Sequence, residues 1–317
     1  MSITNRPRIA NYYESRLGRN DGNPLYMWNA FKQIGCESGH LVPHGDVESF
    51  GTWDLHFEAD WGEDALEGVL PYKPDPIPHP SVFWHSDTHL GYQWRLEKAK
   101  RTDFNFVCQI RAKEEFERDG IKNPIWLPHA VEPMAYPTYQ ELENRLAGRP
   151  VENPVSLLEK PYDIGFVGHV NSENRIEALD KIFGAFPKFF FGQRLFEDAA
   201  SIFHQSKIVF NISIKDDINM RVFEALSTKS FLLTNWIPTL GELFEDGKHL
   251  VTYRTLDEAI EKANYYLNRD EEREKIAQAG FDEVRSKHTF QHRARKILDI
   301  CHPDWDKAES KVLEAVA

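Results

Sequence analysis

The sequence predicts an α/β protein made of two doubly wound domains in tandem that face a central cleft. Short apolar runs alternate with amphipathic runs along the chain, and this alternation is typical of a parallel sheet with helices on both faces. A length of 317 residues fits two domains of roughly 150 residues each. A Pro- and polar-rich segment interrupts the alternation near residue 152. We therefore expect an N-terminal domain over 1–152 and a second domain over 153–288.

The first domain contains strand and helix patterns in turn. Pro24 opens the first helix and Gly35 closes it, which is the usual punctuation of a helix. The predicted strands are RIANYY (8–13), SGHLVP (38–43), TWDLHFEA (52–59), SVFWHS (81–86), FNFVCQI (104–110) and PIWLPHA (124–130). The predicted helices are PLYMWNAFKQIG (24–35), YQWRLEKAKR (92–101) and AKEEFERDG (112–120).

The second domain restarts the pattern and ends in three consecutive helices. Its predicted strands are YDIGFVG (162–168), KFFFG (188–192), IVFNIS (208–213), SFLLTN (230–235) and HLVTY (249–253). Its predicted helices are 173–186, 196–206, 219–227, 239–246, 255–268, 271–287 and a terminal helix from about Thr289. Within each sheet, the carboxyl ends of the strands are the expected ligand site.

The charge and the apolar runs restrict the class of protein. A net charge of −12 and a pI near 5.6 argue against nucleic acid or an anionic membrane as partner, because both would be repelled. No run approaches the ~20 apolar residues of a spanning helix, and the N-terminus lacks a signal-type apolar core. We expect a cytoplasmic protein without membrane insertion. Cys36, Cys108 and Cys301 lack metal or redox spacing.

A polar stripe marks the helix that we expect to begin after Asn219. Arg221, Glu224 and Thr228 share one face at helical spacing, while the neighbouring positions are apolar. Asn219 is a suitable N-cap. Arg221 then lies in the first turn, where the helix dipole and the free N–H groups favour an anion over a cation.

Two interpretations of Arg221 stay open from spacing alone. A phosphate or diphosphate bound at the helix N-terminus would explain the cation, and Glu224, one turn further, would accept hydrogen bonds from hydroxyls such as those of a ribose. Alternatively, Arg221 forms an internal ion pair with Asp216, Asp217 or Glu224.

Several motifs resemble one family of enzymes. The segments NISIKDDINMRVFEALSTKSFLLTN, GELFEDGKHLVTY, NRDEEREKIAQAG and KHTFQHRARKIL resemble the C-terminal domain of group 1 glycosyltransferases of the spore-maturation-protein (CgeB-like) branch. SVFWHSDTHLG and IWLPHAVEP are similar to the N-terminal domain of that branch. The resemblance implies the GT-B type, with two Rossmann-like domains, an N-terminal acceptor domain and a C-terminal donor domain for a nucleotide sugar. It also implies that the final helix (289–317) packs back toward the first domain.

The resemblance assigns roles around the polar stripe. Asp216 and Glu224 have seven residues between them, like two acidic residues of the family, with Asp in place of the commoner Glu. Glu224 would then hold the donor ribose, Asp216 the donor sugar and Arg221 the diphosphate. Ser227-Thr228-Lys229 departs from the family's small-x-Gly step, so the backbone near the donor is expected to differ.

Two loops are further candidates for the donor site. Gly168 follows the first strand of the second domain, where it permits close backbone approach, and Arg175 in the next helix would add a second cation. Gly18 and Arg19 lie in RLGRNDGN (16–23), the counterpart of a loop that approaches the donor phosphates in the resembling enzymes. An ordinary surface loop explains 16–23 equally well.

The acceptor half offers WHSDTHLG (84–91) directly after a strand. Asp87 or His89 would take a proton from an acceptor hydroxyl, or would orient donor and acceptor without acting as a base. Two alternatives stay open: His85, Asp87 and His89 bind a divalent metal in a hydrolase, or Asp87 only caps the next helix.

The sequence therefore predicts a metal-independent glycosyltransferase without a cofactor, which moves a sugar from a nucleoside-diphosphate sugar to an acceptor hydroxyl. A metal-dependent hydrolase and a non-catalytic nucleotide-sugar-binding protein are the alternatives. The sequence does not identify the sugar of the donor, its base or the acceptor.

Overall fold

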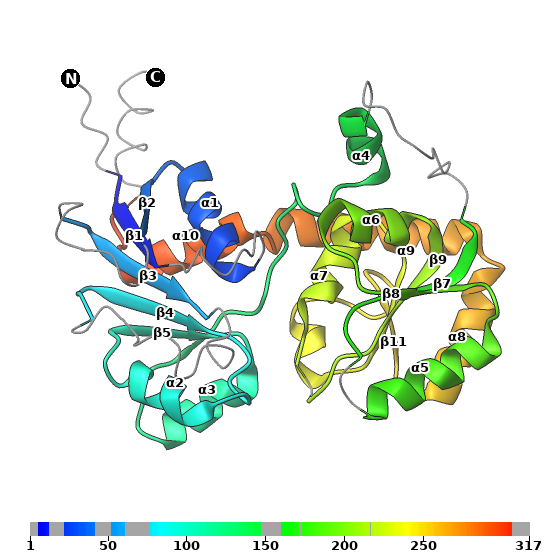
Figure 1. The fold of residues 1–317 in the computed structure, drawn as a ribbon, viewed down its shortest axis with the longest axis horizontal. Coiled ribbons are helices and arrows are strands. Elements are labelled where there is room, and N and C mark those ends of the chain that lie inside the picture. The colour runs from blue at the N-terminus through cyan, green and yellow to red at the C-terminus, as the bar shows by residue number, and fades with distance from the viewer. Residues whose placement is uncertain are drawn as a thin grey trace. The chain divides into compact units, whose positions relative to one another are not determined.

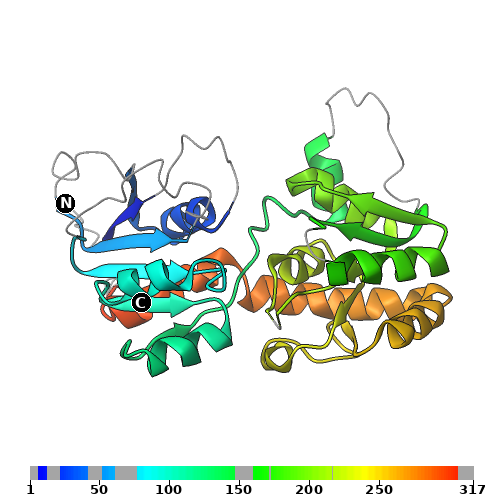
Figure 2. The same ribbon diagram turned by 60° about the horizontal axis from the view of Figure 1, so that its bottom comes forward.

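The chain folds into two compact units, each with its own parallel sheet. The computed structural model describes residues 6–12, 22–41, 52–60, 77–146, 160–170, 173–215 and 217–305. The first unit comprises 1–128 together with 290–317, and the second comprises 129–289. The order of elements in each unit can be followed in Figure 1, and Figure 2 shows the same elements from a second side.

The first unit has a six-stranded sheet of order β2-β1-β3-β4-β5-β6, in which every pair is parallel. Its strands are β1 (Arg8–Tyr12), β2 (Glu37–Leu41), β3 (Leu55–Ala59), β4 (Ser81–His85), β5 (Phe104–Val107) and β6 (Ile125–Trp126). Its helices are α1 (Asn23–Gln33), α2 (Tyr92–Ala99), α3 (Ile110–Arg118) and α10 (Phe290–Cys301). Helices α1 and α10 cover one face of the sheet, and α2 and α3 cover the other (Figure 1).

The terminal helix α10 packs against α1. The rings of Tyr26 and Phe290 lie 5.0 Å apart between centroids. Arg293 is buried and donates from Nε to the carbonyl oxygen of Pro128, at 2.8 Å. These contacts hold 290–301 in the first unit, although 161 residues of the second unit, 129–289, separate it in sequence from the rest of that unit.

The second unit has a five-stranded parallel sheet of order β11-β10-β9-β7-β8. Its strands are β7 (Tyr162–Val167), β8 (Phe189–Gly192), β9 (Ser206–Asn211), β10 (Leu232–Asn235) and β11 (Val251–Tyr253). Its helices are α4 (Tyr139–Leu146), α5 (Glu173–Ala185), α6 (Phe196–His204), α7 (Met220–Ser227), α8 (Leu256–Leu267), α9 (Asp270–Lys287) and the 3-10 turn η4 (Pro238–Glu242). Helices α5 and α8 cover one face, and α6, α7 and α9 cover the other (Figures 1 and 2).

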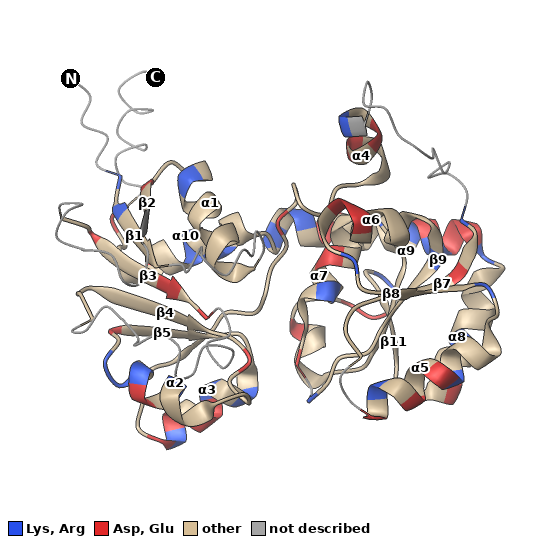
Figure 3. Cartoon of the chain, viewed as in Figure 1, with Lys and Arg blue, Asp and Glu red and all other residues tan. Residues whose placement is uncertain are grey.

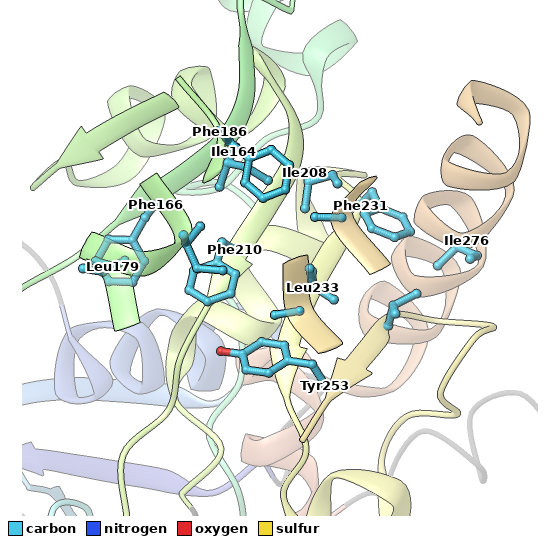
Figure 4. Packing of buried hydrophobic residues seen from close by; sticks show 14 of the residues in the cluster. Ile164, Phe166, Leu179, Phe186, Ile208, Phe210, Phe231, Leu233, Tyr253 and Ile276 are labelled. Carbon is cyan, nitrogen blue, oxygen red and sulfur yellow. The ribbon is translucent and has the colours of Figure 1, made fainter. Parts of the chain in front are cut away.

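A continuous apolar core joins the second sheet to its helices. Phe166, Phe210 and Tyr253 belong to this core, and Leu179 of α5 lies beside Phe166 (Figure 4). The rings of Phe210 and Tyr253 stack with centroids 5.4 Å apart. Charged residues lie mainly on the helices, whereas the strands are mostly uncharged (Figure 3). The strands are buried except at the edge strand β8, where Phe189 and Phe191 are exposed.

The division between the units lies at Pro128 and His129 rather than near residue 152. Helix α4 belongs to the second unit because it is tied to α6: Arg145 Nη1 lies 3.1 Å from Glu197 Oε1. His204 Nε2, at the end of α6, also lies 3.1 Å from the carbonyl oxygen of Pro137. The polar segment that marks 152 in the sequence follows α4 and does not separate the units.

One predicted helix is shorter than expected. The pattern of 239–246 predicts an α-helix, but the chain forms only the 3-10 turn η4. Pro238 begins this turn and Gly241 lies inside it, and both residues disfavour continuation as an α-helix.

Candidate functional site

The strand order of the second sheet creates a switch point between β7 and β9. From β7 the chain moves to β8 at one edge, and from β9 it moves through β10 to β11 at the other. Open α/β sheets bind ligands outside the carboxyl ends of the strands at such a point. Gly168 directly follows β7, Asn211 ends β9, and α7 begins in the chain beyond β9.

Arg221 lies at this switch point in the first turn of α7. Its Nη1 donates to Asn211 Oδ1 at 2.8 Å, and its guanidinium carbon lies 4.7 Å from the centroid of the Phe166 ring. A Cβ added to Gly168 would lie 1.8 Å from Arg221 Nη2. The glycine therefore leaves room for the guanidinium beside the end of β7.

No described carboxylate forms an ion pair with Arg221, and Asp216 lies outside the described residues. Burial is the largest cause that lowers the pKa of Arg221 to about 10; Glu224 acts in the opposite direction, and the charge of Arg175 adds a smaller lowering effect. Arg221 is still protonated at neutral pH. A desolvated cation at a helix N-terminus favours a bound anion, so the first of the two interpretations of Arg221 has the better support.

Asn211 positions Arg221, and the sequence analysis did not single it out. Its side chain is fully buried, and its Oδ1 accepts from both Arg221 and Asn219 Nδ2, the latter at 3.2 Å. Its Nδ2 donates to Thr234 Oγ1 at 2.9 Å and to Ser213 Oγ at 3.3 Å. The amide is therefore fixed in one orientation. The only signal in the sequence is a polar residue that ends the apolar run IVFN.

Arg175 braces the loops around the switch point. It is buried, and it donates from Nη1 to the carbonyl oxygen of His169 at 2.9 Å and from Nη2 to that of Ile212 at 3.0 Å. These two carbonyls belong to the loops after β7 and β9. The hydrogen bonds of Arg175 hold the two loops together, and its charge adds to the positive potential at Arg221.

The remaining donor candidates of the second unit lie around α7. Asn219 is the N-cap residue of α7, but its side chain donates to Asn211 rather than capping the helix. Glu224 lies one turn after Arg221 and is partly exposed. Gly18, Arg19 and Asp216 lie outside the described residues, so their roles stay predictions.

A tryptophan at the same edge of the sheet was also missed by the sequence analysis. Trp236 follows β10 and is 41% exposed, and the guanidinium carbon of Arg254 lies 4.1 Å from the centroid of its ring. Asn235 Oδ1 accepts from the backbone N–H of Ser213 at 2.7 Å. This bond joins the end of β10 to the loop between β9 and α7, so Trp236 lies beside the loop that carries the donor candidates.

In the first unit, the loop after β4 places Asp87 at the carboxyl edge of the sheet. Asp87 is exposed and has a φ of 47°, a left-handed conformation that is uncommon for a residue other than glycine. Such strained positions cluster at functional sites. The N-cap of α2 is Gly91, without a side-chain bond, so Asp87 does not cap that helix. His89 is half-buried in the same loop.

His85 lies inside the core of the first unit. It is fully buried, its Nε2 lies 2.9 Å from Asn105 Oδ1, and its ring packs edge-on against Phe83 and Phe116. Among the described residues, which include His85, Asp87 and His89, no group of three His, Cys, Asp or Glu side chains is placed to hold a metal ion. The geometry therefore gives no support to the hydrolase alternative.

Burial lowers the pKa of His85 to about 3. The folded protein keeps this ring neutral, whereas the unfolded chain binds a proton below pH 6.5. The stabilisation is complete above pH 6.5 and is lost as the pH falls toward the folded value, by about 1.4 kcal/mol per pH unit. We expect His85→Gln to reduce the slope of unfolding free energy against pH between 6.5 and 4.5, measured by urea unfolding. Equal slopes in variant and wild type would show that His85 titrates normally.

Two buried ion pairs join α2 to β3 and were not predicted. Arg95 Nε lies 2.5 Å from Asp60 Oδ2, and both side chains are almost completely buried. Lys98 and Glu58 form a second ion pair, and both of these side chains are also largely buried. Asp60 directly follows β3, so the Arg95 pair lies at the same edge of the first sheet as Asp87. Breaking such a pair leaves a buried charge uncompensated. The two pairs therefore stabilise the position of α2 against β3.

In the described ranges, no helix has the length and apolar character needed to cross a membrane.

Comparison with known proteins gives one match to a protein family and several similar folds. Residues 173–299 match a family described as glycosyl transferase-like, which is less than half of the chain. No curated protein is significantly similar to the chain in sequence.

Solved structures resemble the chain over nearly its whole length. Sucrose-phosphate synthase from Thermosynechococcus elongatus has a TM-score of 0.59 at 11% identity and covers 98% of this chain and 100% of its own. HepE from Anabaena, solved in complex with UDP and glucose, has a TM-score of 0.61 at 12% identity, with coverages of 92% and 98%. A glycosyltransferase from Rickettsia africae has a TM-score of 0.58 at 10% identity, with coverages of 96% and 99%.

These likenesses confirm the predicted fold class: both units are parallel α/β domains of the GT-B type. The family match supports the prediction of a glycosyltransferase. The chain therefore has a GT-B fold, and most of its second unit matches the glycosyl transferase-like family.

Proposed function

We propose that the protein is a glycosyltransferase of the spore-maturation-protein branch, which uses a nucleoside-diphosphate sugar as donor and needs no metal ion. The observation that carries the proposal is Arg221, a partly buried cation in the first turn of α7 with no described carboxylate as ion-pair partner. The match of 173–299 to glycosyl transferase-like proteins supports it.

In this proposal, the diphosphate lies on Arg221 and on the free N–H groups at the start of α7. Gly168 leaves room for the Arg221 guanidinium at the end of β7, and Arg175 contributes its charge. As the sugar leaves, negative charge grows on the diphosphate, and fixed positive charge in a desolvated site stabilises it. This is the role that a divalent cation has in other transferases, so we expect full turnover in the presence of a chelator.

Glu224 would accept hydrogen bonds from the ribose, and Asp216 from the donor sugar. On the first unit, Asp87 or His89 would take the proton of the acceptor hydroxyl or orient that hydroxyl. HepE was solved with UDP and glucose, which makes UDP the first nucleotide to test.

The test is calorimetry of the full chain with UDP, GDP, ADP, CDP and TDP. For the tightest nucleotide, we expect the 2′,3′-dideoxy analogue to bind about 10-fold to 100-fold more weakly, since hydrogen bonds to a charged acceptor contribute about 1.5–3 kcal/mol. In Glu224→Ala, the ribose and dideoxy forms should bind alike. The matched control is Glu242→Ala, at an exposed position in η4, which should preserve the difference.

The outcomes separate the alternatives. Failure of every nucleotide to bind contradicts the donor site. Binding that is insensitive to the ribose hydroxyls removes the role of Glu224. Binding without turnover of any corresponding nucleotide sugar identifies a non-catalytic nucleotide-sugar-binding protein.

A further inference from the structure

A large cavity lies at the amino ends of the strands of the second sheet, whereas Arg221 lies at their carboxyl ends. It has a volume of about 1050 Å³ and is formed where β7, β9 and β10 begin. Its walls come from the start of α4, the end of α6, the segment between α7 and β10, and the first three turns of α9. The six residues of β9 span roughly 17–20 Å at 3.3 Å per residue, so this cavity is distinct from the proposed donor site.

Basic side chains dominate the lining. Lys160, Lys207, Lys229 and Arg273 face the cavity, against the carboxylates of Asp270 and Glu274. Lys207 Nζ lies 2.8 Å from Asp163 Oδ1, and Arg273 is paired with Asp270. Within the described ranges, Lys160 and Lys229 form no ion pair. The cavity thus has an excess of positive charge in a chain of net charge −12.

Lys160 is an exposed residue that lies among charges of both signs. The pKa of Lys160 is lowered by desolvation first and then by Arg273, and Glu274 and Asp270 offset part of this. Lys160 in turn helps to lower the pKa of His204 to about 4, after the larger effect of burial. His204 is therefore neutral at pH 7 and contributes no charge. An anion beside Lys160 and Arg273 would relieve the repulsion between them.

The rest of the lining suits a ring attached to an anion. Phe231, Ala277 and Phe281 provide apolar surface, and Tyr139 provides an aromatic ring. Tyr139 and Gln140 are the first residues of α4, where backbone N–H groups point out of the helix. Small-molecule sites have volumes of about 300–1,000 Å³ and combine apolar walls with a few polar groups, and this cavity has that size and composition.

We propose that the cavity is a second ligand site, which binds a small phosphorylated molecule that carries a ring. A phosphate monoester has close to two negative charges at neutral pH, which matches Lys160 and Lys229, the two lysines of the lining that have no ion-pair partner among the described residues. The apolar walls would contact the ring. This inference goes beyond the proposed transferase function and does not depend on it, because the two sites share no residue.

The test uses calorimetry of the full chain with three probes: phenyl phosphate, inorganic phosphate and benzoate. We expect phenyl phosphate to bind most tightly, since it offers both the dianion and the ring. The double variant Lys160→Gln/Lys229→Gln should bind it at least 10-fold more weakly. Two controls should bind it like the wild type: Lys248→Gln, which removes an exposed lysine paired with Glu245, and Arg221→Gln.

The remaining outcomes overturn the proposal. Absence of phenyl phosphate binding, or equal binding by the double variant, removes the site. Loss of binding in Arg221→Gln but not in the lysine variant places the anion at the donor site instead. Tighter binding of benzoate than of phenyl phosphate contradicts the phosphate assignment. UDP binding is the control for these outcomes. If UDP binds the double variant and the wild type alike, the proposed donor site is intact, and a failure of the cavity proposal does not count against the proposed function.

Discussion

Replacement of Arg221 by methionine is expected to lower the rate of sugar transfer by a factor of about 10²–10³, the usual effect of removing one fixed group that stabilises developing negative charge. Methionine keeps much of the apolar volume of the side chain beside Phe166 but removes the guanidinium. The measurement is kcat and KM with the nucleotide sugar whose nucleotide binds best, together with calorimetry of that nucleoside diphosphate.

Two further variants distinguish direct contact from positioning. Arg221→Lys retains the charge but loses the planar fork, so its rate should fall between those of wild type and Arg221→Met. Asn211→Leu removes the amide that holds Arg221 at 2.8 Å and should weaken binding of the diphosphate by about 10-fold. The nucleoside without phosphates should bind Asn211→Leu and wild type alike. If Arg221→Met binds the diphosphate like the wild type, Arg221 is only part of the fold.

Replacement of Gly280 by alanine is expected to lower the free energy of unfolding by about 2–3 kcal/mol, which is the scale of overpacking in a dense core. Gly280 lies inside α9, and a Cβ there would be 2.2 Å from the carbonyl oxygen of His249 and 2.7 Å from Leu226 Cδ2. The backbone oxygen of His249 cannot turn away as a side chain can, so α9 must shift away from the segment that precedes β11. Urea unfolding followed by circular dichroism measures the loss.

Gly184 provides the matched control. It also lies in a helix, α5, but a Cβ there would meet nothing within 4 Å. Gly184→Ala should therefore raise the free energy of unfolding by about 0.5–1 kcal/mol, because alanine has the higher helix propensity. Similar effects of the two substitutions would mean that helix propensity, not the contact with His249, decides the result at Gly280.

The elements of the fold were predictable because their signals are local. The apolar strands and the amphipathic helices follow directly from composition and period. The cap of α8 is also local, because Thr255 accepts from the N–H of Glu258, three residues away, at 3.2 Å. The predicted boundary between the two units differs from the observed one because the contacts of α4 with α6 join residues that are 52 apart in sequence. No local pattern contains such a contact.

The candidate site was partly predictable for the same reason. Arg221 could be singled out because a cation in the first turn of a helix conflicts with the helix dipole. Asn211 could not, because its importance comes from four hydrogen-bond partners spread from Ser213 to Thr234. Lys160 and Lys229 become neighbours of one cavity only after the sheet has formed.

Helix α7 has a role at each of its ends. Arg221 lies in its first turn, and Thr228 and Lys229, directly after its last residue, line the basic cavity. Eight residues at 1.5 Å each make a rod of about 12 Å, packed against α9 along its side. A ligand that moves this rod along its axis at one end necessarily moves it at the other. In that case the two binding equilibria would be linked, and each ligand would change the affinity for the other by the same factor.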